Sequence, residues 1–154
     1  GDDKHKITTA EEYEEAKNLL KTYDTYASIP GITKGADDAK YRNWVNGKIV
    51  AYENSIEADK TTAAQKRVNA YRDSEARRIE NEFARVMNNY TDEVNAKANV
   101  KAKIDDVNNA ITALKGKAFT VANASEEAAK KANIDADIAN IRALIAVYEA
   151  EAVK

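Results

Sequence analysis

The residue types that most often carry catalysis are scarce in this sequence. Cysteine is absent, and histidine occurs once, as His5, near the start of the chain. Their scarcity excludes thiol nucleophiles, Ser-His-Asp catalysis and the histidine-rich ligand sets of zinc and di-iron sites. We therefore expect no enzyme, no metal ion and no organic cofactor.

A calcium loop is the one metal motif that the carboxylates imitate. Asn133, Asp135 and Asp137 alternate as the first ligands of such a loop do. The loop also needs a glycine where Ile138 stands and a bidentate glutamate where Leu144 stands. The pattern therefore predicts helix rather than a metal site.

Arginines form the most uneven charge pattern of the chain. Five of the seven lie between Arg67 and Arg85, and residues 60–85 hold seven basic and four acidic side chains. Arg67, Arg78 and Arg85 are 11 and 7 residues apart, which returns each to nearly the same angle on a helix. This row is either a solvated face paired with acidic neighbours, or a site for an anionic polymer or partner. The acidic candidates for pairing are Glu75, Glu80 and Glu82.

An aromatic pair, Tyr41 and Trp44, follows the stretch SIPGITKG, which holds the only proline and two of the five glycines. Aromatic residues beside such a loop are candidates for an exposed ligand or partner contact. Most of the other tyrosines fall on predicted apolar stripes, where the ring packs in the core and the hydroxyl group reaches its rim.

Helices are the elements that must position these residues, because apolar residues recur at steps of three and four through most of the chain. The first predicted helix begins after Thr9, which forms a capping box with Glu12. Its apolar stripe is predicted to be buried, and it must stop near Ser28, because Pro30 disfavours the helical conformation just before it. The stripe consists of Tyr13, Ala16, Leu20, Tyr23 and Ala27.

A second helix is predicted from residues 36–38 and weakens at ADKTTAAQ, where Thr61 or Thr62 would cap a new helix. Residues 62–115 contain neither proline nor glycine. They form either one helix or two helices separated at NNYTDE, with Thr91 as the cap of the second. We favour the break.

The stretch GKAFTVANASEE interrupts the helical pattern and is predicted to be an ordered crossover. Gly116 would end a helix in the left-handed conformation, Phe119 and Val121 would pack on the end of the bundle, and Asn123 with Glu126 would cap the last helix. That helix carries Ile134, Ile138, Ile141, Ile145, Tyr148 and Ala152 on one stripe.

These elements predict an all-α fold, an elongated up-and-down bundle of four or five helices. Residues 1–8 are predicted to be a flexible tail, and residues 9–154 a single bundle module. The chain has 154 residues, which is the size of one domain.

Around AITALKGKAFTVANASEEAAKKA the sequence resembles the alanine-rich helical modules of bacterial surface-layer and other Gram-positive cell-surface proteins. The similar region spans residues 100–150, where one helix end is followed by a short extended segment and a new Ala-, Glu- and Lys-rich helix. Such modules often carry proline where this chain has Lys115 and Gly116. The resemblance implies a secreted structural or wall-associated role.

We therefore expect a non-enzymatic structural module of a bacterial cell surface or other extracellular assembly, serving as spacer or wall attachment. The alternative is an intracellular or virion-associated helical protein that binds a partner helix or assembles with itself. Expected partners are an anionic cell-wall polymer or other copies of the same chain. The net charge of −2 gives no argument for nucleic acid, and the sequence contains neither a membrane-spanning apolar run nor a signal peptide.

Overall fold

The computed structural model describes residues 5–32 and 35–154, and these residues form helices, turns and connecting segments without a strand. The predicted all-α fold is confirmed. By internal contacts the chain divides into two compact units, Gly1–Asp59 and Lys60–Lys154. We call them unit 1 and unit 2. The sequence analysis placed no division there. The first four residues of the predicted tail lie outside the described residues.

Helix α1 spans Ala10–Ala27 and begins as predicted. The Thr9 hydroxyl group accepts a hydrogen bond from the Glu12 amide at 3.1 Å, and the Glu12 carboxylate accepts one from the Thr9 hydroxyl group. Ser28 is the C-cap, two residues before the proline. Gly31 follows with φ +87°, the one left-handed residue among those described.

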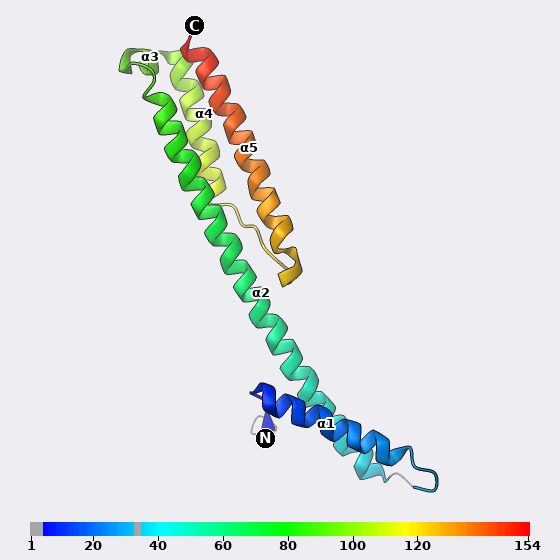
Figure 1. Cartoon of the computed structure of the whole chain (residues 1–154). Helices are drawn as coiled ribbons and strands as arrows, with labels where there is room; N and C mark the ends of the chain where they lie inside the picture. The colour runs from blue at the N-terminus through cyan, green and yellow to red at the C-terminus, as the bar shows by residue number, and fades with distance from the viewer. Residues whose placement is uncertain (1–4, 33–34) are drawn as a thin grey trace. The chain divides into compact units, whose positions relative to one another are not determined.

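Helix α2 spans Ala36–Met87 without interruption (Figure 1). The predicted weakening at residues 58–65, with Thr61 or Thr62 as a new cap, is therefore wrong. That stretch holds no proline or glycine, and Ala, Lys and Gln are good helix formers, so the two threonines alone do not stop the helix.

The break after α2 is confirmed. Helix α2 ends at Met87, and Thr91 caps the short helix α3, Asp92–Ala96, by accepting from the Val94 amide at 3.2 Å. A further interruption at Lys97, which is extended with ψ 138°, separates α3 from α4, Ala98–Lys115. No proline or glycine marks this second interruption in the sequence.

The crossover between α4 and the last helix is ordered, as predicted. A 3₁₀ turn, Ala124–Glu126, leads into helix α5, Glu127–Ala152. Phe119 and Val121 are both 4% exposed. Gly116 does end α4, but its φ is −96°, so the predicted left-handed conformation is wrong. The helix instead closes through the Gly116 amide, which donates to the Thr112 carbonyl group at 3.2 Å.

Unit 2 has one apolar core between α4, α5 and the part of α2 that follows residue 60, and Figure 1 shows these three helices side by side. Tyr148 lies at one end of the core, fully buried, with its ring edge-on to Phe83 and Tyr90. Its hydroxyl group donates to the side chain of Asn95. The predicted stripe of α5 is buried from Ile134 to Tyr148, and Ala152 is partly buried against it.

Candidate functional site

Unit 1 is a hairpin of α1 and the first part of α2 and has little core of its own. Helix α1 has 18 residues, all of them described, and none is buried. On α2 within this unit, Val45 and Ile49 are the buried apolar residues of the described region, at 5% and 6% exposure. The predicted stripe of α1 is half-buried rather than buried, because only one helix packs against it.

Aromatic and charged contacts join the two helices of the hairpin. Tyr13 stacks at a tilt on Tyr52, with ring centroids 5.0 Å apart, and its hydroxyl group donates to Glu53 at 3.0 Å. That hydrogen bond to a carboxylate raises the pKa of Tyr13 above its usual value. Near the turn, Arg42 donates to both carboxylate oxygens of Asp24 at 2.8 and 3.0 Å. These contacts fix the register of α1 against α2.

The predicted aromatic pair is exposed on this hairpin. Tyr41 is 54% exposed and Trp44 is 38% exposed, and their rings stack with centroids 5.9 Å apart. His5 meets the Trp44 ring edge-on at 5.6 Å, and the Lys48 ammonium group lies 5.3 Å from the centroid of the same ring. Contact of this pair with a ligand or partner stays a prediction.

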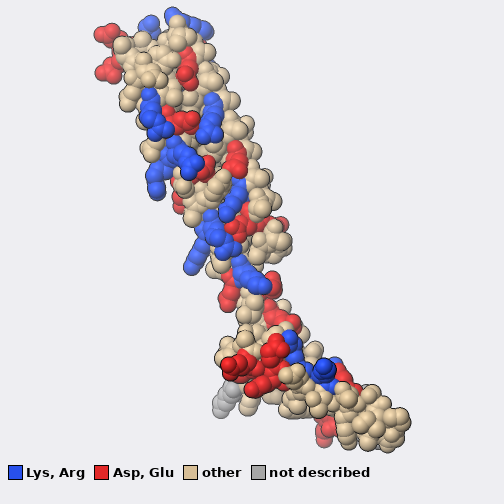
Figure 2. Space-filling model, viewed as in Figure 1, with Lys and Arg blue, Asp and Glu red and all other residues tan. Residues whose placement is uncertain are grey.

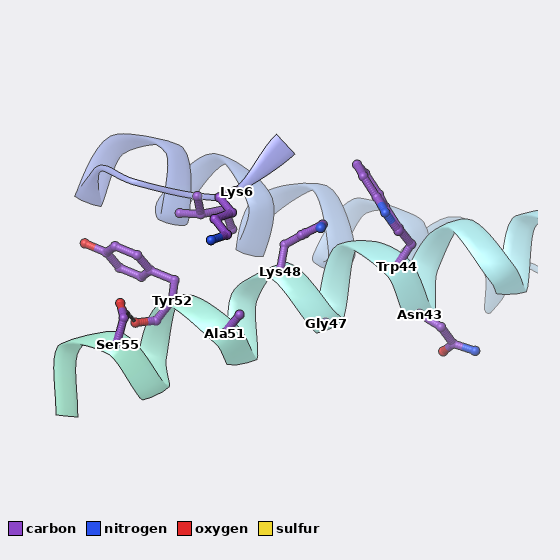
Figure 3. A pocket seen from close by; sticks show the side chains of 9 residues that line it. Lys6, Asn43, Trp44, Gly47, Lys48, Ala51, Tyr52 and Ser55 are labelled. Carbon is purple, nitrogen blue, oxygen red and sulfur yellow. Dashed lines mark hydrogen bonds between the residues drawn. The ribbon is translucent and has the colours of Figure 1, made fainter. Parts of the chain in front are cut away.

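A continuous groove runs along the hairpin beside Trp44. One hollow of about 540 Å³ is lined by Lys6, Gly47 and Ala51, among others. In Figure 3 Trp44, Lys48 and Tyr52 project from one side of α2. A second hollow shares Ile7, Trp44 and Lys48 with the first. A third hollow shares Leu19, Tyr41 and Val45 with the second, so the three follow one another along the hairpin.

The groove is apolar and aromatic at its centre, with charges of opposite sign on its two walls. Leu19 and Tyr26 on α1 are 44% and 53% exposed and extend the apolar surface of Tyr41. On the α1 wall the charged residues of the middle hollow are Glu12 and Glu15. Such a surface suits a helix with an apolar face.

Gly47, inside α2, also belongs to this groove. A Cβ atom built at this position would meet nothing within 4 Å. The glycine is therefore not required by packing within the described chain, although it weakens a helix interior by about 1 kcal/mol relative to alanine. Sequence reasoning missed Leu19, Tyr26 and Gly47 as groove residues. Leu19 could have been identified from the sequence, because it is an apolar residue that lies outside the predicted stripe of α1.

The predicted arginine row lies on α2 in unit 2, and its members differ in environment. Arg67 pairs with Glu127 of α5, with nitrogen to oxygen distances of 2.8 to 3.1 Å. Hydrogen bonds from Arg67 and then Lys131 lower the pKa of Glu127 to about 2. Arg78 reaches Glu75 only at 3.6 Å, and Arg85 forms no ion pair with any residue that the structure describes.

The acidic residues considered for this row mostly pair elsewhere. Glu80 accepts from Lys115 of α4 at 2.6 Å, and Glu82 accepts from Arg142 of α5 at 3.2 Å. The sequence analysis did not find Glu127, because it lies 60 residues from Arg67 and becomes a neighbour only through the packing of α5 on α2.

The calcium-like triplet lies within helix α5, as the sequence pattern predicts. Asp135 accepts a hydrogen bond from the Tyr71 hydroxyl group, which raises the pKa of Tyr71 to about 12. Asp137 pairs with Lys117 at 2.9 Å. Within the described parts of the chain, no group of three or more His, Cys, Asp or Glu residues is placed to hold a metal ion.

Comparison with protein families, with curated proteins and with solved structures finds no match to this chain. Among the described helices, none combines the length and apolar character that a membrane span needs.

Proposed function

We propose that this chain is a non-enzymatic structural module that assembles with copies of itself through the hairpin of unit 1. The observation that carries the proposal is the exposed apolar groove of a hairpin that buries only two apolar residues, Val45 and Ile49, among those described. Helices gain most of their stability by burying an apolar face against other helices. A two-helix hairpin meets that need when a second hairpin completes a four-helix bundle.

The charges on the groove walls favour a second copy as the occupant. Glu12 and Glu15 lie on the α1 wall, and Lys48 lies on the α2 wall. The contacts of Tyr13 with Tyr52 and of Asp24 with Arg42 place Glu15 and Lys48 at about the same height along the hairpin. The groove therefore has an acidic wall on α1 and a basic wall on α2, at about the same height along the hairpin.

A two-fold axis parallel to the hairpin makes this surface self-complementary. That symmetry sets α1 of one copy against α2 of the other, so each Glu15 faces a Lys48 of its neighbour. A two-fold axis across the hairpin would set α1 against α1 and bring carboxylates together, which costs free energy. The first arrangement is the one that we propose.

The single tryptophan makes the test direct, because Trp44 lies in the groove. The emission maximum should shift to shorter wavelength as the concentration of the full chain rises from about 1 μM to about 1 mM, in step with dimer formation by sedimentation velocity. Transfer of the partly exposed indole ring into an apolar interface is the cause of the shift.

Leu19→Lys and Val147→Lys form a matched pair, because the two side chains are 44% and 46% exposed. We expect Leu19→Lys to abolish association and Val147→Lys, on α5, to leave it unchanged. A chain that stays monomeric at about 1 mM with constant Trp44 emission would refute the proposal.

Charge reversal tests the proposed symmetry. Glu15→Lys alone and Lys48→Glu alone should each weaken association. In a dimer of either variant, positions 15 and 48 face each other with charges of the same sign at both symmetry-related contacts. An equimolar mixture of the two variants should restore association as a heterodimer, since every facing pair then has opposite charges. Equal association of each variant alone and of the mixture would contradict this arrangement.

A bacterial cell surface is the setting implied by the resemblance of residues 100–150, and we include it in the proposal as a spacer or attachment role. The alternative setting is intracellular or virion-associated. The gene sequence preceding this chain distinguishes them, because a secretory leader there supports the surface location and its absence from the precursor contradicts it.

A further inference from the structure

A strip of cations runs along α2 in unit 2 on the side opposite the core. The core side of the helix is marked by Val68, Ile79 and Phe83. At about 100° per residue, the opposite sector of about 120° contains, between positions 61 and 88, Lys66, Arg67, Arg77, Arg78 and Arg85 and no acidic residue. In Figure 2 blue side chains follow this part of the surface.

The acidic residues of this part of α2 lie on the flanks of the strip. Glu80 pairs with Lys115 of α4, and Glu82 pairs with Arg142 of α5. Asp73 pairs with Arg72 of the same helix. The contacts of Glu80 and Glu82 direct these two carboxylates toward α4 and α5 and away from the outer face.

Within the strip, Arg67 is closely paired, Arg78 is weakly paired, and Lys66, Arg77 and Arg85 are unpaired among the described residues. The pair of Arg67 with Glu127 is close and bidentate, whereas Arg78 has only the 3.6 Å approach of Glu75. Among the described residues, Lys66, Arg77 and Arg85 have no ion pair or hydrogen bond through their side chains. The structure thus replaces the predicted row of three arginines by a set of cations without a close ion pair, Lys66, Arg77, Arg78 and Arg85.

Small side chains separate these cations. Ala70, Ser74, Asn81 and Ala84 occupy the same sector, and all are exposed. At 1.5 Å per residue, Arg85 lies about 11 Å from the Arg77 and Arg78 pair, and Lys66 lies about 17 Å from it on the other side. An extended polymer can therefore lie close to the helix and meet a cation every two to three turns.

We propose that this strip binds a linear polymer of phosphate groups. Guanidinium groups donate two hydrogen bonds at once to phosphate oxygens, and three of the four cations are arginines. The sector contains no aromatic residue on which a base could stack, so recognition is through the phosphates alone. The site is independent of the groove in unit 1 and adds an attachment function to the assembly function.

The test measures binding of the full chain to long-chain inorganic polyphosphate by fluorescence anisotropy of the labelled polymer. We expect affinity to fall steeply as salt rises from about 20 to 200 mM, because each contacted phosphate releases counterions. Poly-L-glutamate should bind at least tenfold more weakly. The proposal would be overturned if polyphosphate did not bind at about 20 mM salt. It would also be overturned if polyglutamate bound as tightly as polyphosphate, or if single-stranded DNA bound more tightly than polyphosphate.

Arg85 and Arg67 provide a matched pair, because they are 18 residues apart and so have the same angle on the helix. Arg85→Gln should weaken binding about three- to tenfold and reduce the slope of log affinity against log salt by about 0.7 to 1. Arg67→Gln should change affinity less than twofold, since its charge is already paired with Glu127.

The triple variant Arg77→Gln, Arg78→Gln, Arg85→Gln should lose at least 30-fold in affinity while its circular dichroism spectrum stays that of the parent, since all three side chains are exposed. Equal effects of Arg67→Gln and Arg85→Gln, or a triple variant that binds as the parent does, would show that the strip is not the site.

Discussion

The side chain of Gln65 fastens the crossover to α2, and its loss should destabilise unit 2. Its amide nitrogen donates to the Phe119 carbonyl group at 3.0 Å, and its oxygen accepts from the Val121 amide at 2.9 Å. Gln65→Met keeps the length of the side chain and removes both of these hydrogen bonds, together with the one that the same nitrogen donates to the Asn69 side chain at 3.0 Å.

The magnitude follows from these two contacts. Each net hydrogen bond is worth about 1 kcal/mol, and the amide of the buried residue Val121 is left without a partner at a further cost of about 1 to 2 kcal/mol. We expect a loss of about 3 kcal/mol in the free energy of unfolding and a fall of roughly 5–15 °C in the melting temperature.

Urea and thermal unfolding followed by far-ultraviolet circular dichroism measure the effect, with Lys66→Met, at the neighbouring exposed position, as the control. Gln65→Glu gives a second signature. The ionised carboxylate still accepts from Val121 but repels the Phe119 carbonyl group, whereas the protonated form donates to it.

Because the pKa of the introduced carboxyl is therefore raised in the folded state, stability relative to the parent should be greatest below about pH 4 and fall as pH rises. A Gln65→Met variant within about 0.5 kcal/mol of the Lys66→Met control would refute the reasoning.

Three further predictions concern single side chains. The pKa of Tyr71 is about 12, so the stability from its hydrogen bond to Asp135 is present below pH 10 and lost as pH rises toward 12. Tyr71→Phe should therefore flatten the pH dependence of the free energy of urea unfolding between pH 10 and 12. An unchanged curve would contradict this. The pKa of Glu127 is about 2, so its contribution to the free energy of unfolding is present above pH 4.5 and lost as pH falls through about 2. Glu127→Gln should reduce the loss of stability between those pH values. A variant as sensitive to acid as the parent would count against the Arg67 contact. Gly47→Ala should raise the free energy of unfolding by about 1 kcal/mol at low micromolar concentration, since its Cβ atom would meet nothing within 4 Å, whereas a destabilised variant would indicate a clash.

Local signals predicted the helix boundaries that the chain marks with specific residues. Thr9 and Thr91 cap helices where the sequence places them, and the C-cap of α1, Ser28, lies two residues before Pro30. The interruption at Lys97 has no such signal in the sequence. Threonines at 61 and 62 gave a false cap signal, because a cap residue stops a helix only when the backbone leaves the helical conformation there, and tertiary packing of α2 favours its continuation.

The candidate sites were predictable only where one element contains them. The spacing of Arg67, Arg78 and Arg85 predicted that they share one face of a helix. The position of Trp44 near Pro30 predicted that its ring is exposed. Which arginine is neutralised depends on Glu127 of another helix, and no local pattern reveals a partner 60 residues away. Of the carboxylates nearer in sequence, Glu75 does approach Arg78 on the same helix, whereas Glu80 and Glu82 pair with α4 and α5.

The stripes of α1 and α5 have similar spacing but different burial, and this difference bears on the function. From Ile134 to Tyr148 the α5 stripe is buried, because α2 and α4 both pack on it within unit 2. The α1 stripe, including Tyr13 and Leu20, is only half-buried against one helix, although its periodicity predicts the same burial. Periodicity therefore identifies the face of a helix that is suited to burial, but it does not say what covers that face. Where the described chain supplies two covering helices, the stripe forms a core. Where it supplies one, the apolar surface around Leu19 and Trp44 stays exposed, and this is the surface that we propose a second copy covers.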